Sequence, residues 1–206
     1  MASICIPFYS RYGNTETMAK AVAEGVRQAG SEPTLAFVGD VMTPAEVMAA
    51  DERWQATHDR LMAEYPAASV DAFGAADGVC VGAPTRFGVM AAQAKLFFDK
   101  MGGLWMSGAT IGKPAGVFTS TATLHGGQEV SCYTMWPVLA HLGMVIVGVP
   151  YSVQELLTTK TGGGPYGPSH VAGGAGDIPV DETELAICRA LGERVAKIAD
   201  ALAAAR

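Results

Sequence analysis

Five short apolar runs, separated by stretches with helical periodicity, constrain the fold of this 206-residue chain more than any other feature. Several runs are nearly continuous in apolar residues instead of alternating with polar ones, as expected of strands buried on both faces of a sheet. Such strands alternating with helices predict an α/β fold with a doubly wound parallel sheet of five strands. The runs span residues 4–9, 34–38, 78–83, 115–119 and 144–149.

Helical periodicity is clearest in three stretches. It predicts helices over residues 16–29 and 90–101 and a terminal helix that opens with Asp181 and Glu184 in capping-box spacing. Pro7 is discordant with the first strand, because a central strand needs the N–H that proline lacks, and it implies either a bulge or a lost ladder hydrogen bond.

Two segments depart from the alternation of strands and helices. Residues 43–72 are rich in Ala, Glu and Met and predict one or two helices inserted before the third strand. Residues 150–179 are dense in Gly and Pro and show no periodicity. A long irregular segment of this kind in a compact domain is usually functional or held by a partner chain.

Composition narrows the class of protein. A net charge of −6 and the lack of any basic run argue against a nucleic-acid groove or an anionic membrane surface as partner. No apolar run approaches the ~18 residues of a membrane span. The four cysteines are widely spaced, which favours reduced thiols in a cytoplasmic protein. We see no linker and expect a single domain over residues 1–206, with no metal site.

A polar turn between the first apolar run and the first helix is suited to a phosphate monoester. It combines hydroxyl and amide side chains, a turn glycine and the unpaired N–H groups of a helix N-terminus. A P-loop is excluded because it needs Gly-Lys followed by Ser or Thr, and the chain's Gly112 and Lys113 are followed by Pro114. A pyrophosphate site is not indicated either, because no G-x-G-x-x-G occurs in this turn. An ordinary polar turn with a good N-cap is the alternative. The turn consists of Ser10, Arg11, Tyr12, Gly13, Asn14 and Thr15.

Two further loops follow predicted strands and should meet this turn at the carboxyl edge of the sheet. Residues 82–88 form a tight turn that exposes Arg86 beside Phe87, as a planar ring with a polar edge would require. The alternative is a plain turn with Phe87 folded into the core. Residues 120–128 are small, hydroxyl-bearing and Gly-rich, and they offer N–H donors. Together the three loops fit a flat heterocycle bearing one phosphate, which describes flavin mononucleotide (FMN).

An ordered set of motifs carries a family resemblance from about Ser3 to Ala199. The chain resembles the WrbA family of flavodoxin-like NAD(P)H:quinone oxidoreductases. The resemblance implies a flavodoxin-like fold with strand order 2-1-3-4-5, FMN as cofactor, a homotetramer, and two-electron reduction of quinones by NADH or NADPH. The motifs are Gly-Ala-Pro-Thr-Arg-Phe-Gly at 82–88, Gly-Gly-Leu-Trp at 102–105, His-Gly-Gly-Gln-Glu at 125–129, Gly-Pro-Tyr-Gly at 164–167 and Ala-Gly-Gly at 172–174.

The resemblance also implies roles for individual residues. The turn at residues 10–15 would hold the phosphate, and Tyr12 would also touch the nicotinamide cosubstrate. Trp105 would form a substrate-side wall, and His141 would be the catalytic histidine near the flavin, both at sites closed by neighbouring subunits. The other cofactor-binding residues are Pro84, Thr85, Arg86, Phe87 and Gly88 at the isoalloxazine, and Ser120, Thr121, Ala122, Thr123, Leu124, His125 and Gly126 at the pyrimidine edge and ribityl chain.

Trp105 and His141 each have a simpler structural interpretation. Trp105 could cap a helix C-terminus and staple a loop, and His141 could be a histidine favoured by a helix C-terminus. The predicted activity is FMN-dependent, ping-pong reduction of a small quinone by NAD(P)H. The alternatives are a flavodoxin-type electron carrier and a non-catalytic interaction protein on the same fold.

Overall fold

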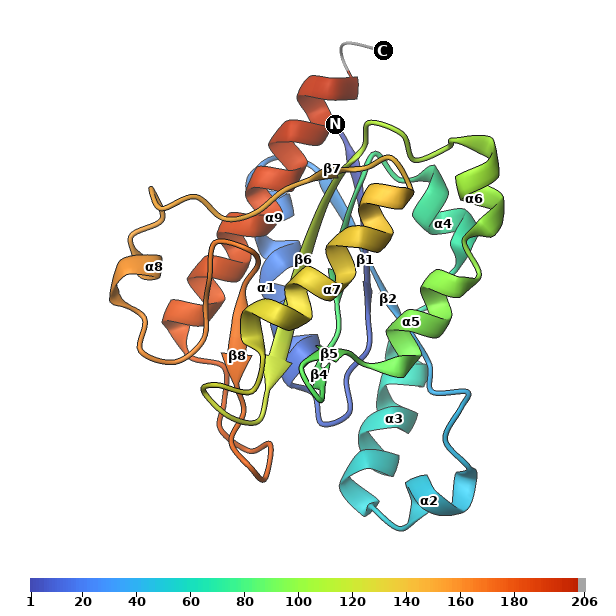
Figure 1. Cartoon of the computed structure of the whole chain (residues 1–206), viewed down its shortest axis with the longest axis vertical. Helices are drawn as coiled ribbons and strands as arrows, with labels where there is room; N and C mark the ends of the chain where they lie inside the picture. The colour runs from blue at the N-terminus through green and yellow to red at the C-terminus, as the bar shows by residue number, and fades with distance from the viewer. Residues whose placement is uncertain (204–206) are drawn as a thin grey trace.

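A parallel sheet forms the centre of the computed structural model, which describes residues 1–203; the last three residues of the predicted domain lie outside the described residues. Its main strands are β1 (Ser3–Phe8), β2 (Glu32–Phe37), β3 (Gly78–Gly82), β6 (Pro114–Thr121) and β7 (Val145–Ile146). They lie in the order β2-β1-β3-β6-β7 (Figure 1). These strands are the five apolar runs, so the predicted fold class and strand order are confirmed.

Pro7 lies within a regular central strand. β1 pairs with β2 along its whole length, with Pro7 opposite Ala36. With β3 it pairs at Ile4, Cys5 and Phe8 in one unbroken register. No extra residue enters the strand, so Pro7 causes no bulge there. The pairing with β3 is interrupted only around Pro7, which is where its missing N–H removes a ladder hydrogen bond.

Helices cover both faces of the sheet (Figure 1). α1 (Asn14–Gln28) and α9 (Glu182–Ala203) pack side by side on one face, and α4 (Val70–Ala75), α5 (Ala92–Asp99) and α7 (Gln128–His141) cover the other. The first pair approaches closely because glycines face the partner backbone. A Cβ on Gly25 would lie 1.9 Å from the carbonyl oxygen of Arg189, and one on Gly192 would lie 2.0 Å from that of Val22.

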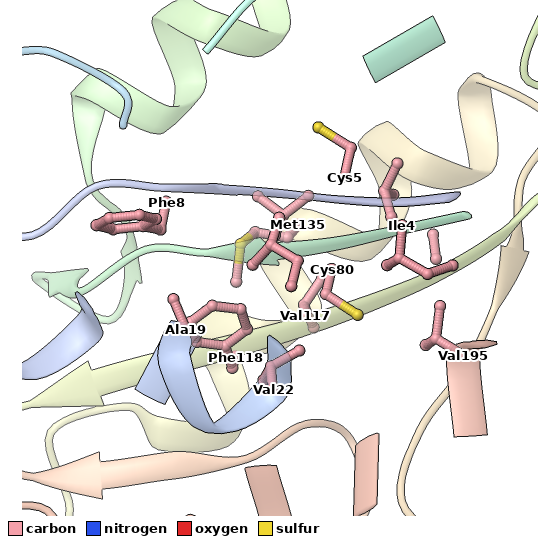
Figure 2. Packing of buried hydrophobic residues seen from close by; sticks show 14 of the residues in the cluster. Ile4, Cys5, Phe8, Ala19, Val22, Cys80, Val117, Phe118, Met135 and Val195 are labelled. Atoms are coloured by element: carbon pink, nitrogen blue, oxygen red, sulfur yellow. The ribbon is translucent and has the colours of Figure 1, made fainter. Parts of the chain in front are cut away.

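The core lies between the sheet and these helix layers. Figure 2 shows Ala19 and Val22 of α1 packed near Phe118 of β6, with Val195 of α9 further along the sheet. All four are fully buried. The four cysteines are free and buried as well. No helix within residues 1–203 is both long enough and apolar enough to cross a membrane.

The predicted insertion before the third strand is helical. Besides α4 it contains α2 (Ala45–Ala49) and α3 (Glu52–Glu64), which extend past the sheet at its carboxyl edge (Figure 1). Glu16, at the start of α1, anchors α3. Its carboxylate accepts hydrogen bonds from Arg60 on α3 and from the Tyr65 hydroxyl at 3.0 Å, and it pairs with Lys20 at 2.7 Å.

The Gly- and Pro-rich segment is more regular than its sequence predicts. Residues 162–167 form a loop, but the segment also contains α8 (Glu155–Thr158) and β8 (Ser169–Val171). β8 pairs in parallel with the carboxyl half of β6, opposite its last three residues, and is a sixth strand. The expectation of an irregular segment was wrong because a three-residue strand shows no periodicity and depends on pairing with a distant strand.

The third apolar run leads into a small hairpin and two helices. β4 (Thr85–Arg86) and β5 (Val89–Met90) pair in antiparallel fashion, and α6 (Gly102–Ser107) follows α5. Met90 therefore belongs to a strand, and the helix predicted over residues 90–101 begins later, at Ala92. The turn chemistry of the hairpin overrides the apolar spacing that suggested an earlier start.

Candidate functional site

A pocket of about 390 Å³ lies at the carboxyl edge of the sheet, within the size range of cofactor sites. Four chain segments meet there: the β1–α1 turn, the β4–β5 hairpin, the loop after β6 and the loop after β8. The lining residues are Ser10, Arg11, Tyr12, Asn14, Thr15, Pro84, Thr85, Arg86, Phe87, Ser120, Thr121, Ala122, Thr123, Gly126, Ala172, Gly173, Gly174 and Gly176.

The β1–α1 turn presents an open helix N-terminus to this pocket. Gly13 is the N-cap, with φ of 95°, and no side chain caps the helix. The first hydrogen bond of the helix runs from Thr17 N to Gly13 O at 3.0 Å, so the N–H groups before Thr17 have no carbonyl partner within the helix. Ser10 Oγ accepts the Gly13 N–H at 3.0 Å and fixes the turn. This end of α1 is therefore arranged as an anion cradle and lacks the capping side chain of an ordinary polar turn.

Two side chains of the cradle are held by the inserted helix α3. The Tyr12 hydroxyl donates to Asp51 Oδ2 at 2.5 Å, and Arg11 Nη2 lies 3.1 Å from the same oxygen. The Arg11 guanidinium also lies 3.9 Å above the ring of Trp54. Hydrogen bonds from Tyr12 and from the Trp54 N–H hold the pKa of Asp51 below its usual value. Asp51 is the N-cap of α3, so one carboxylate both starts this helix and fixes the cradle.

The hairpin places a guanidinium at the pocket wall. Arg86 is half-buried, and its Nη1 donates to the carbonyl of Thr85 at 2.8 Å. Burial lowers the pKa of Arg86. Within the described part of the chain no carboxylate lies in salt-bridge distance of Arg86. Its other N–H groups are therefore available to acceptors of a ligand in the pocket.

The turn of the hairpin is strained. Phe87 and Gly88 are its two central residues, with φ of 52° and 83°. A two-residue hairpin turn with both φ values positive favours Asn or Gly, so a phenylalanine there is unfavourable. The Phe87 side chain is fully exposed, at 105% of its reference area. The alternative of a phenylalanine folded into the core is therefore wrong.

The loop after β6 closes against this hairpin. Thr121 Oγ1 donates to the carbonyl of Thr123 at 2.9 Å and shapes the loop. Gly127 has φ of 92° and is the N-cap of α7, and a Cβ there would lie 2.8 Å from Gly88 Cα. The two loops thus touch through glycine backbone and form one continuous wall.

The fourth wall was not predicted. This wall is lined by Ala172, Gly173, Gly174 and Gly176. Residues 172–174 were identified from the sequence only as a family motif. They follow β8, whose carboxyl end lies beside that of β6. A prediction of β8 from the sequence would have located them, since loops after neighbouring parallel strands meet at one edge.

Six predicted site residues do not line the pocket. Gly13, Gly88, Leu124 and His125 belong to its loops without facing it. Trp105 and His141 lie together in a separate hollow of about 230 Å³, with Phe98, Met101, Gly102, Val138 and Leu142.

The positions of Trp105 and His141 in their helices bear on the simpler interpretations of these residues. Trp105 lies in the last turn of α6 and is 58% exposed. His141 is the last residue of α7, a position that the helix dipole favours for a basic side chain.

Comparison with known proteins places this geometry in context. The family described as NADPH-dependent FMN reductase matches residues 9–155. A protein of Geobacter sulfurreducens named NAD(P)H dehydrogenase (quinone) is 46% identical over 202 residues, which cover 96% of this chain and 97% of that protein. A protein of the same name from Syntrophobacter fumaroxidans is 47% identical over 199 residues, covering 95% and 96%.

Solved structures share the fold. The crystal structure of the flavodoxin, WrbA-like protein from Agrobacterium tumefaciens has a TM-score of 0.69 at 23% identity and covers 98% of this chain and 99% of its own. A flavodoxin from the domain Archaea has a TM-score of 0.62 at 16% identity, with coverage of 96% and 99%.

Proposed function

The chain belongs to the NADPH-dependent FMN reductase family, together with relatives named NAD(P)H dehydrogenase (quinone), and we propose that it is an FMN-dependent NAD(P)H:quinone oxidoreductase. The observation that carries this proposal is the pocket in which an open helix N-terminus, a half-buried arginine and a glycine-rich wall meet. The relatives supply the reaction class, and the pocket supplies a place for it.

The residues present fit FMN. A single phosphate suits the cradle at Gly13, because the helix end is uncapped and Ser10 and Thr15 bring hydroxyl groups to it. The cradle lacks the glycine pattern of a pyrophosphate loop. Arg86 at the opposite wall offers donors that match the carbonyl edge of a flat ring. A half-buried guanidinium with no carboxylate in salt-bridge distance among the described residues would be costly without such a ligand.

The reaction divides between the cofactor and the chain. When bound, FMN would supply the hydride acceptor and two-electron donor that link the nicotinamide to the quinone. We assign Arg86 and the N–H groups of residues 120–126 to holding the ring and to favouring negative charge on it. The exposed Phe87 would cover the ring edge from water, and Tyr12 would border the nicotinamide. Donor and acceptor would use one face in turn, which is a ping-pong cycle.

Assembly is part of the proposal. Trp105 and His141 share a hollow away from the pocket, so within one chain they do not reach it. We propose a homotetramer in which a neighbouring chain brings these residues to the flavin of this one. The exposed apolar side chains Trp105, Met106 and Ile111 support such a contact surface. We further propose that residues 1–206 form one domain and act in the cytoplasm, where free, buried cysteines such as the four described here are common.

Steady-state kinetics test the reaction cycle. With FMN-loaded protein, initial rates measured at several fixed benzoquinone concentrations should give parallel double-reciprocal lines against NADH or NADPH. Intersecting lines would exclude a ping-pong cycle. Turnover too slow to measure, with a flavin still bound, would favour the electron carrier, and failure to bind FMN would favour the non-catalytic protein.

A further inference from the structure

The loop after β8 is tied down at both ends, and its tip is held by a residue of the inserted helix α3. We call residues 172–178 the flap, because they form the pocket wall beside the cradle. At the base of the flap, Ile178 N donates to Ala172 O at 3.0 Å. His170 Nε2 lies 3.0 Å from the carbonyl of Ile178.

The tip of the flap is held by a fork of hydrogen bonds. Arg53 Nη1 donates to the carbonyl of Ala175 at 3.0 Å, and Arg53 Nη2 donates to that of Gly176 at 2.7 Å. Asn14 Nδ2, from the cradle, reaches the same Gly176 carbonyl at 3.1 Å. The planar guanidinium suits two adjacent carbonyls, which an ammonium group could not engage in the same way.

The ring of Tyr12 packs against both Arg53 and Gly176. The Arg53 guanidinium is 4.7 Å from the ring centroid, and a Cβ on Gly176 would lie 3.1 Å from the ring. A side chain at position 176 would crowd this ring, and φ there is positive at 66°, which favours glycine. Asp51, two residues before Arg53, accepts a hydrogen bond from the Tyr12 hydroxyl. The start of α3 therefore makes hydrogen bonds to both the cradle and the flap.

We propose that Arg53 is a positioning residue that latches the flap against the cradle, so that the inserted helix sets how fast the cofactor escapes. The proposal rests on the proposed FMN site, because the flap borders its phosphate end. No carboxylate lies in salt-bridge distance of Arg53 among residues 1–203, so the carbonyls of the flap are its described hydrogen-bond acceptors. A latch that opens rarely slows cofactor release without touching the reacting ring.

The test compares Arg53→Ala and Arg53→Lys with Arg27→Ala, a control that removes an exposed arginine from the far end of α1. FMN dissociation is followed by flavin fluorescence after mixing with excess of a second apoflavoprotein as trap. We expect FMN release about 10-fold faster for Arg53→Ala, a smaller increase for Arg53→Lys and no change for the control. In the protein without FMN, amide hydrogen exchange of residues 173–177 should accelerate by about the same factor.

Three outcomes would overturn the latch. The first is release and exchange within twofold of the original protein. The second is a Lys variant equal to the original, because charge alone would then suffice. The third is a parallel fall in the urea midpoint, which would make Arg53 a contributor to global stability only. The exchange arm needs no cofactor, so it still tests the latch if the original protein binds no FMN, and that failure would count against the proposed function alone.

Discussion

At the scale of single residues, the clearest sign of function is strain that brings no structural benefit. Phe87 occupies a turn position that favours Asn or Gly, and its side chain buries nothing in the described chain. Backbone strain of this kind costs of order 1–3 kcal/mol and persists mainly at functional sites. The resemblance to WrbA-type proteins predicted the role of this residue, but the sequence alone did not show the strain.

Replacing Phe87 with glycine tests this view. Phe87→Gly should raise the free energy of unfolding by about 0.5–1 kcal/mol, because relief of strain exceeds the entropy cost of glycine. The KM for the quinone should rise in the same variant. Urea denaturation and steady-state kinetics measure the two effects, and a less stable variant would show that the turn carries no strain.

Arg86 should act through its free N–H groups. Arg86→Met keeps much of the side-chain volume and removes the donors, so we expect FMN affinity to fall about 10- to 100-fold, as for a lost hydrogen bond from a charged group. Fluorescence titration of the FMN-free protein measures this. Equal affinity in the variant would remove Arg86 from the cofactor site.

At the scale of elements, an acidic residue controls how α3 is attached. Burial alone would raise the pKa of Glu16, but hydrogen bonds from Arg60, Lys20 and Tyr65 outweigh it and lower the pKa to about 2. A carboxyl group whose pKa is lower in the folded state stabilises the fold above its unfolded pKa of 4.5 and loses this effect as pH falls toward 2.

The pH dependence of stability therefore tests this attachment. Between pH 4.5 and pH 2 the contribution lost from Glu16 should amount to about 3 kcal/mol. Urea denaturation across this range should show a shallower decline for Glu16→Gln than for the original protein. Identical slopes would mean that α3 is held by other contacts.

β8 depends on a second buried carboxylate. Glu184 accepts from Gly162 N at 2.8 Å and Asp181 N at 3.0 Å, and His170 Nδ1 lies 2.7 Å away. Glu184→Gln should lower the free energy of unfolding by about 3 kcal/mol, because an amide has one acceptor oxygen in place of two and leaves one of these three partners without its hydrogen bond. Glu193→Gln, at a half-buried position on the same helix where the carboxylate pairs only with the exposed Lys197 among the described residues, is the control. Equal urea midpoints for the two variants would contradict this role.

These elements also show what the sequence could predict. The capping box of Asp181 and Glu184 was predicted and is present, with both of its hydrogen bonds made. Local spacing also predicted the main strands and the inserted helices. β8 and the flap were missed because they depend on contacts with distant segments, such as Thr119 of β6, and local patterns carry no trace of those contacts.

At the scale of the whole molecule, the described chain holds the cofactor pocket and the hollow of Trp105 and His141 apart. His141→Ala should lower kcat for quinone reduction about 10-fold or more if a neighbouring chain places His141 at the quinone oxygen. FMN affinity should be retained. Unchanged turnover would remove His141 from the mechanism.

The most direct test of the central claim is an anaerobic titration of the FMN-loaded protein, since it examines cofactor, donor and acceptor together. One equivalent of NADH or NADPH per flavin should bleach the flavin absorbance, and one equivalent of benzoquinone should restore it. A flavin band that persists after both nucleotides, or that stays bleached after the quinone, would contradict the assignment of this pocket to NAD(P)H:quinone chemistry.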